Sequence, residues 1–211
     1  MPTTLQDAVD FLQQGGKNGV EIVAGATDWF PARGERPLCQ PILDITKIAE
    51  LQGIERTLQG WRFGAAVTWS DILTADLPNC FAGLKAAGRE VGSVQIQNVA
   101  TLAGNLCNAS PAADGVPPLL TLDAAVEIAS LSGVRSVPLA EFVLGVRQTA
   151  LQPGEMVTAV TVPVLPMHVS EGVGCFIKIG ARKYLVISIT MVAALVAVAD
   201  GKMAEARVAV G

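Results

Sequence analysis

Residues 97–114 of the chain read QNVATLAGNLCNASPAAD. Asparagine, threonine and serine side chains gather here between apolar residues, and Pro111, Pro117 and Pro118 restrict the backbone. Their amides and hydroxyls suit a phosphate, a sugar or a heterocycle, and Asp114 could accept a hydrogen bond from a ribose hydroxyl. Long irregular loops inside compact domains are typical of binding sites, so we predict such a loop here. The alternative is a structural loop whose polar side chains satisfy its own backbone.

A second candidate loop lies upstream, where the strand-like run 20–24 ends in GATDW at residues 25–29. Small residues let backbone N–H groups approach a phosphate closely, and successive amides can bind an anion. A turn of this composition is also common after a strand, with Thr27 or Asp28 capping it. Taken alone, this loop leaves both interpretations open.

The flanking sequence predicts a mixed α+β protein. Thr4 and Asp7 predict the start of a helix over 5–12 that ends at Gly15 and Gly16. Further helices are expected over 71–77, capped by Ser70, and over 81–90. Apolar runs predict strands at 20–24, 41–45, 61–66, 126–130, 134–137 and 156–162. The tail predicts an antiparallel meander of 175–178, 187–199 and 206–210.

Composition excludes several classes of protein. The 211 residues include 15 Lys and Arg and 19 Asp and Glu, giving a net charge of −4, and no basic stripe suits nucleic acid. The most apolar run, 185–199, is shorter than the roughly 20 residues of a membrane-spanning helix. The N-terminus lacks the apolar stretch of a signal peptide, so a cytoplasmic location is expected.

The residues that usually carry metal or acid–base chemistry are sparse. The spacing of Cys39, Cys80, Cys107 and Cys175, with His168 as the single histidine, gives no metal-binding motif. We expect the cysteines to be buried as small hydrophobic residues and His168 to lie at the surface. Neither a dinucleotide-binding glycine motif, a P-loop nor a nucleophile motif occurs, so no catalytic side chain is expected. A bound cofactor would carry any chemistry.

In their order and separation, the two loops resemble the FAD-binding medium subunit of the xanthine dehydrogenase and carbon monoxide dehydrogenase family of molybdenum hydroxylases. The segments LGVRQT (144–149), PGE (153–155) and FIKIGAR (176–182) resemble it too, so the likeness covers essentially the whole chain. It implies a PCMH-type FAD-binding fold of two subdomains, 1–57 and 58–172, followed by the start of a C-terminal antiparallel-sheet domain, 173–211. Because family members continue past Gly211, the chain is expected to be truncated in that domain.

The resemblance also implies which residues contact FAD. Both loops would wrap its diphosphate, and later residues would lie along the ribityl, ribose and flavin parts. The implied contacts are Ala24, Gly25, Ala26, Thr27, Asp28, Trp29, Thr101, Ala103, Gly104, Asn105, Ser110, Asp114, Val157 and Lys178. The family usually has paired glycines where this chain has Ala26 and Ala103, and an alanine in a left-handed backbone position costs about 1 kcal/mol. Gln97 and Gln148 stand where the family often has a basic residue.

By resemblance, the chain is an electron-transfer subunit. A large molybdopterin subunit would oxidise the substrate, a small subunit with [2Fe–2S] clusters would reduce the FAD, and NAD or another acceptor would take the electrons. Two alternatives stay open. One is a stand-alone flavin oxidoreductase, and the other is a truncated paralogue or fragment that acts as an interaction module without flavin.

Overall fold

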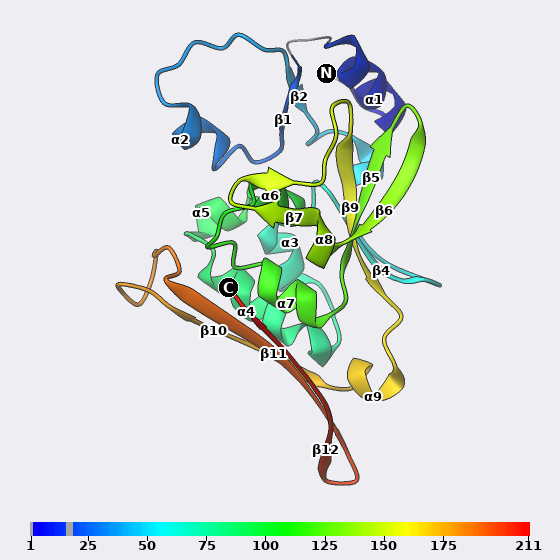
Figure 1. The fold of residues 1–211 in the computed structure, drawn as a ribbon, viewed down its shortest axis with the longest axis vertical. Coiled ribbons are helices and arrows are strands. Elements are labelled where there is room, and N and C mark those ends of the chain that lie inside the picture. The colour runs from blue at the N-terminus through cyan, green and yellow to red at the C-terminus, as the bar shows by residue number, and fades with distance from the viewer. Residues whose placement is uncertain (1, 16–18) are drawn as a thin grey trace.

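The computed structural model describes residues 2–15 and 19–211, which form helices and four β-sheets (Figure 1). The α-helices are α1 (Leu5–Gln14), α2 (Trp29–Arg33), α3 (Trp69–Thr74), α4 (Ala82–Glu90), α5 (Val94–Gln97), α6 (Leu102–Asn108), α7 (Val116–Thr121), α8 (Leu139–Phe142) and α9 (Met167–Ser170), and the 3-10 helices are η2 (Ala49–Leu51) and η3 (Asn79–Phe81). The strands are β1 (Glu21–Val23), β2 (Ile42–Asp44), β3 (Ile54–Thr57), β4 (Gly60–Gly64), β5 (Ala125–Ser130), β6 (Gly133–Pro138), β7 (Val143–Gly145), β8 (Gln148–Thr149), β9 (Met156–Pro163), β10 (Val173–Ile179), β11 (Thr190–Ala199) and β12 (Lys202–Val210).

Two helix starts show how local hydrogen bonds set the boundaries. The Thr4 hydroxyl accepts a hydrogen bond from the Asp7 N–H at 3.2 Å, which confirms the predicted cap of α1, while Gly16 lies outside the described residues. The predicted Ser70 cap of α3 is wrong. Thr68 caps this helix instead, because its hydroxyl accepts from the Asp71 N–H while the Asp71 carboxylate accepts from the Thr68 N–H.

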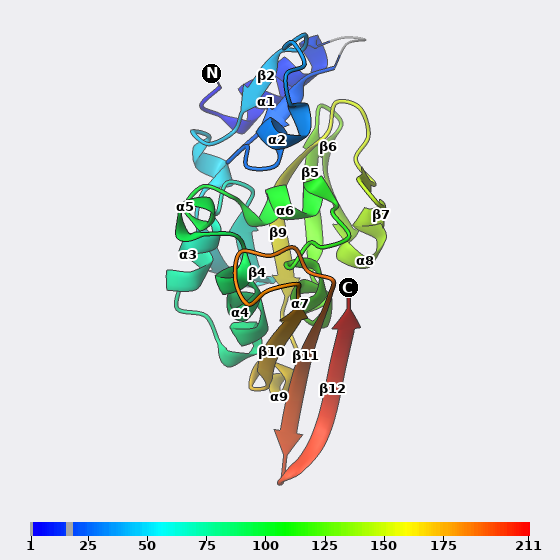
Figure 2. The same cartoon turned by 90° about the vertical axis from the view of Figure 1, so that its left-hand side faces the viewer.

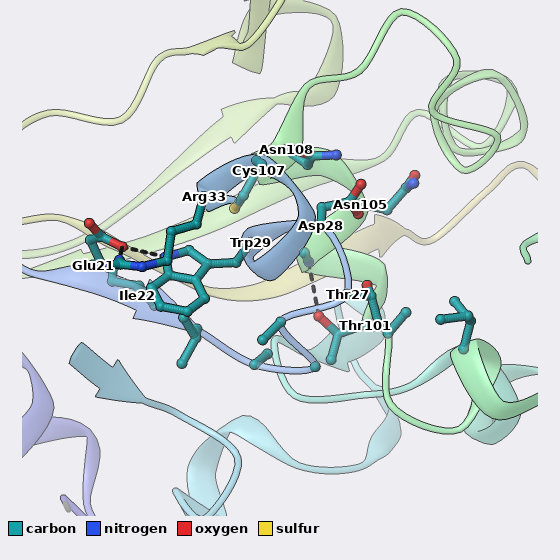
Figure 3. Close-up of a pocket in the computed structure, with 18 of the residues that line it drawn as sticks. Glu21, Ile22, Thr27, Asp28, Trp29, Arg33, Thr101, Asn105, Cys107 and Asn108 are labelled. Atoms are coloured by element: carbon teal, nitrogen blue, oxygen red, sulfur yellow. Dashed lines mark hydrogen bonds and ion pairs between the residues drawn. The ribbon is translucent and has the colours of Figure 1, made fainter. Parts of the chain in front are cut away.

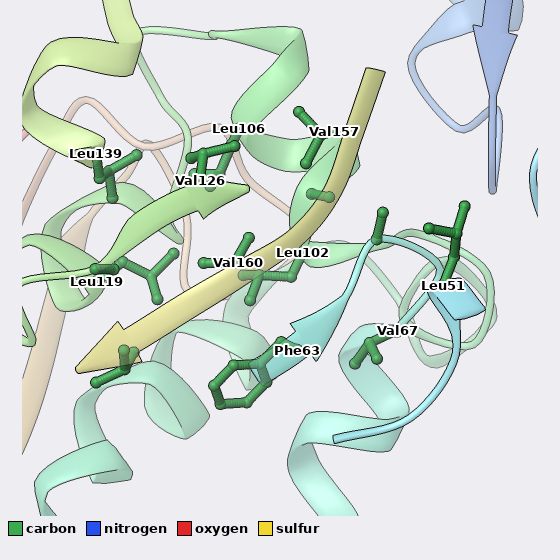
Figure 4. Close-up of a cluster of buried hydrophobic side chains, with 14 of the residues drawn as sticks. Leu51, Phe63, Val67, Leu102, Leu106, Leu119, Val126, Leu139, Val157 and Val160 are labelled. Atoms are coloured by element: carbon green, nitrogen blue, oxygen red, sulfur yellow. The ribbon is translucent and has the colours of Figure 1, made fainter. Parts of the chain in front are cut away.

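The central sheet holds five antiparallel strands in the order β3-β4-β9-β5-β6. Its buried side chains pack against α6 and α7, and this packing forms the main core (Figure 4). Labelled members of this core include Phe63, Val126 and Val160 from the sheet and Leu102, Leu106 and Leu119 from the two helices. The predicted hairpin of β5 and β6 is confirmed.

The segment 97–114 differs from the expected irregular loop, because α6 occupies its middle. Thr101 caps this helix by accepting a hydrogen bond from the Gly104 N–H at 2.9 Å. Leu102, Ala103 and Leu106 are buried on one face of it. The apolar residues at helical spacing outweigh the glycine and asparagines that favoured a loop.

Two smaller sheets lie at opposite ends of the molecule (Figures 1 and 2). The parallel pair β1-β2 lies beside α1 at one end, and the antiparallel meander β10-β11-β12 extends at the other. One face of the meander packs on α4 and α7, whereas register places the exposed residues Ile177, Val192 and Val210 side by side on its other face.

The α+β class and the C-terminal meander are therefore confirmed. The subdomain boundaries at residues 57 and 172 stay a prediction. No described helix is both long and apolar enough to cross a bilayer.

Candidate functional site

A cleft of about 780 Å³ lies between the loop after β1 and the exposed side of α6 (Figure 3). That volume is in the range of small-molecule binding sites. Gly25 allows the loop to lie against the segment that precedes α6, since a β-carbon at this position would lie 1.9 Å from the carbonyl oxygen of Val99. The absence of a side chain at Gly25 therefore permits a close backbone approach between the two walls of the cleft.

The first wall consists of residues 24–29, all predicted contacts, and all six line the cleft. Ala26 has a φ of 52°, a left-handed conformation that an alanine adopts at a cost of about 1 kcal/mol. Its carbonyl accepts a hydrogen bond from the Phe30 N–H, which joins the loop to α2. Within the described part of the chain, neither Thr27 nor Asp28 uses its side chain in a hydrogen bond, so both are available to a ligand.

The second wall consists of residues on one side of α6. Thr101, Gly104 and Asn105 were predicted contacts and line the cleft, and Cys107 and Asn108 extend the same wall. The Asn105 side-chain oxygen accepts a hydrogen bond from the Gly115 N–H at 3.2 Å, so its amide nitrogen keeps its donors for a ligand. This wall therefore presents neutral hydrogen-bonding groups.

Five other predicted contacts lie outside the lining of the cleft. Ala103 and Val157 belong to the hydrophobic core, and the Ser110 hydroxyl accepts a hydrogen bond from the Ala112 N–H. Asp114 and Lys178 form an ion pair at 2.8 Å, with side chains only 8% and 5% exposed. That pair ties the segment after α6 to β10.

Charged side chains that the sequence argument did not single out complete the cleft. Glu21, Arg33 and Arg36 all line it. Arg33 lies 5.0 Å above the Trp29 indole and 3.9 Å from Glu21, while the Trp29 indole N–H donates to the same carboxylate (Figure 3). A signal was available, since two arginines three residues apart follow the loop.

The cysteine prediction needs correction. Cys80 is buried, but Cys39, Cys107 and Cys175 are exposed. Cys39 and Cys107 line the cleft, and Cys175 alternates with buried neighbours on β10, so its side chain lies on the outer face of the meander. Within residues 2–15 and 19–211, no group of three His, Cys, Asp or Glu side chains is arranged to hold a metal ion.

His168 lies at the surface, as expected, and its Nε2 is 2.8 Å from Glu205.

The glutamates with shifted pKa values lie outside the cleft lining. Arg207 and His168 lower the pKa of Glu205, and Arg135 lowers that of Glu155 through a hydrogen-bonded ion pair. The lining of the cleft itself supplies hydrogen-bonding and charged groups for a polar ligand.

Comparisons with known proteins agree with this interpretation. The family model for the FAD binding domain in molybdopterin dehydrogenase matches residues 1–165. The glyceraldehyde dehydrogenase medium chain of Sulfolobus acidocaldarius is 35% identical over 164 residues, which cover 77% of this chain and 58% of the relative. The xanthine dehydrogenase FAD-binding subunit of Escherichia coli O157:H7 is 33% identical over 212 residues, covering 99% of this chain and 71% of the relative.

A solved structure has the same fold. Reconstituted CO dehydrogenase from Oligotropha carboxidovorans superposes with a TM-score of 0.87 and 25% identity, covering 99% of this chain and 72% of the solved one. The chain thus spans between 58% and 72% of the length of these three relatives.

Proposed function

The chain belongs to the family of FAD-binding domains of molybdopterin dehydrogenases, and from this membership we propose that it binds FAD in the cleft between residues 24–29 and α6. The observation that carries the proposal is the contact between Gly25 and Val99, because it joins the two loops implied by the family resemblance into one site.

The groups present fit FAD. The Thr27 hydroxyl and the Asn105 amide can donate hydrogen bonds to phosphate or sugar oxygens, and the Asp28 carboxylate can accept one from a sugar hydroxyl. Arg33 supplies a cation in the same cleft. These residues would bind and orient the cofactor. When bound, FAD supplies the exchange of single electrons with an iron–sulfur centre and of electron pairs with a soluble acceptor.

The proposed role is that of the flavin-carrying part of a multi-subunit molybdenum hydroxylase. Its partners would be a large molybdopterin subunit and a small [2Fe–2S] subunit, and NAD or another acceptor would receive the electrons. Support comes from the relatives, which are named as medium chains or FAD-binding subunits of dehydrogenases.

The test begins with the purified chain. We expect a yellow protein that releases FAD on denaturation, or an apoprotein that binds added FAD in calorimetry. A colourless chain that binds no added FAD would instead favour an interaction module. Oxidation of NAD(P)H without any partner would favour a stand-alone oxidoreductase, whereas co-purification with molybdopterin and iron–sulfur subunits would support the complex.

A further inference from the structure

Arg33, at the end of α2, holds an unusual position in the wall of the cleft. We propose that its guanidinium binds a diphosphate oxygen of the nucleotide cofactor, an inference that rests on the proposed FAD function. Nothing in the family resemblance assigns a role to this side chain.

The side chain is held in place before any ligand binds. Its guanidinium lies 5.0 Å above the Trp29 ring and its side chain is only 14% exposed. Trp29 is itself fixed, because its indole N–H donates to Glu21. Cation–π contact and burial restrict the arginine, so little conformational freedom would be lost when it binds an anion.

One nitrogen of this guanidinium lacks a partner. Arg33 Nη2 is buried and, within the described part of the chain, forms no hydrogen bond. An arginine stays charged at any ordinary pH, so the donor cannot be neutralised. Buried donors without acceptors are costly, and because Arg33 lines the cleft, a small turn of its guanidinium would bring this donor to a ligand oxygen.

The neighbouring charged side chains of the described residues do not provide a hydrogen-bond acceptor for Arg33 Nη2. Glu21 Oε2 lies 3.9 Å from the other terminal nitrogen, Nη1, and this oxygen already accepts a hydrogen bond from the Trp29 indole N–H. Arg36 also lines the cleft, but its guanidinium donates to the carbonyl oxygens of Ala32 and Arg33 at the end of α2. The remaining donors of Arg36 belong to an exposed residue, so water can accept from them, whereas the donor of Arg33 that has no partner among the described residues is buried.

The diphosphate is the part of FAD that matches this group. The isoalloxazine, ribityl and adenosine parts are neutral at pH 7, whereas the diphosphate carries the negative charge. Charge-assisted hydrogen bonds between arginine and phosphate are stronger than neutral ones, and most strongly so away from bulk water.

The test compares Arg33→Met with a matched control. Arg56→Met removes the same charge from a similar arginine–tryptophan pair, 6.0 Å above Trp61, outside the cleft lining. Binding of FAD, ADP and neutral riboflavin is measured for each protein by calorimetry or fluorescence, and circular dichroism verifies folding. Arg33→Lys, which keeps the charge but not the forked donors, serves as a second variant if Arg33→Met fails to fold.

We expect Arg33→Met to weaken FAD and ADP binding by about tenfold or more and to leave riboflavin binding within about twofold, with Arg33→Lys in between. The Arg56→Met protein should bind all three like the natural chain. The inference is overturned if the Arg33 variants bind FAD and ADP as tightly as the natural chain, or lose riboflavin equally. If the natural chain binds ADP through Arg33 but not FAD, only the proposed function fails, and if it binds neither, both fail.

Discussion

Replacing Gly25 by alanine should separate the two walls of the cleft. The new β-carbon would lie 1.9 Å from the Val99 oxygen, 2.4 Å from the Val99 carbonyl carbon and 2.9 Å from the Ala100 nitrogen. Ordinary contacts lie at about 3.5 Å, so the backbones would have to part by more than about 1 Å. Overpacking typically costs 1–3 kcal/mol, and here no flexible side chain can move aside, so we expect a loss of about 3 kcal/mol.

Urea unfolding of Gly25→Ala, followed by circular dichroism with and without FAD, measures this loss. Gly145→Ala is the matched control, because its β-carbon would meet its nearest neighbour, Gln148 Oε1, at 3.6 Å. The control should be as stable as the natural chain or slightly more so. FAD should stabilise the control and not the Gly25 variant. An unfolding free energy for Gly25→Ala within about 0.5 kcal/mol of the natural value would refute the reasoning.

Three further predictions concern single side chains. Ala26→Gly should raise the free energy of unfolding by about 0.5 kcal/mol, because relief of the left-handed strain at φ 52° exceeds the added freedom of glycine in the unfolded chain; a lower urea midpoint would contradict this. The pKa of Glu155 is lowered from 4.5 by Arg135, so the stability from this pair is complete above pH 4.5 and is lost as the pH falls through the lowered value; Glu155→Gln should flatten that acid loss in thermal melts, and an unchanged acid profile would count against it. Asp114→Ala should cost about 3 kcal/mol even without FAD, because it leaves the Lys178 ammonium buried without its counter-ion, and adding Lys178→Met should recover much of that loss; additive losses would exclude the coupling.

Sequence patterns predicted those parts of the fold that depend on neighbours in the chain. The α1 cap joins residues three apart, and the β5–β6 hairpin joins runs separated by a short turn. The α3 cap shows the limit of such patterns, because Ser70 was predicted and Thr68 is the cap. Both residues are good caps, and the choice depends on which hydroxyl meets the Asp71 N–H.

The family resemblance predicted that the two loops meet at one diphosphate, but not which residues of distant segments contact each other. Gly25 and Val99 are far apart in the chain, and the signature of their contact is only a missing side chain. The Asp114–Lys178 pair joins residues 64 positions apart. Each residue could be suspected of binding a ligand, but the pairing of the two charges with each other required the fold.

Lys178 and Arg33 differ in whether their charged groups already have hydrogen-bond acceptors within the described part of the protein. The sequence argument placed Lys178 beside the flavin, and that assignment stays a prediction. In the structure, Lys178 Nζ donates to Asp114 and to the Glu90 carbonyl, so its charge is compensated before a ligand arrives. Arg33 instead keeps a buried donor without a partner in the described residues. Glu21 compensates the Arg33 charge only at 3.9 Å, whereas Asp114 lies 2.8 Å from Lys178 Nζ, so FAD binding should depend more on Arg33 than on Lys178.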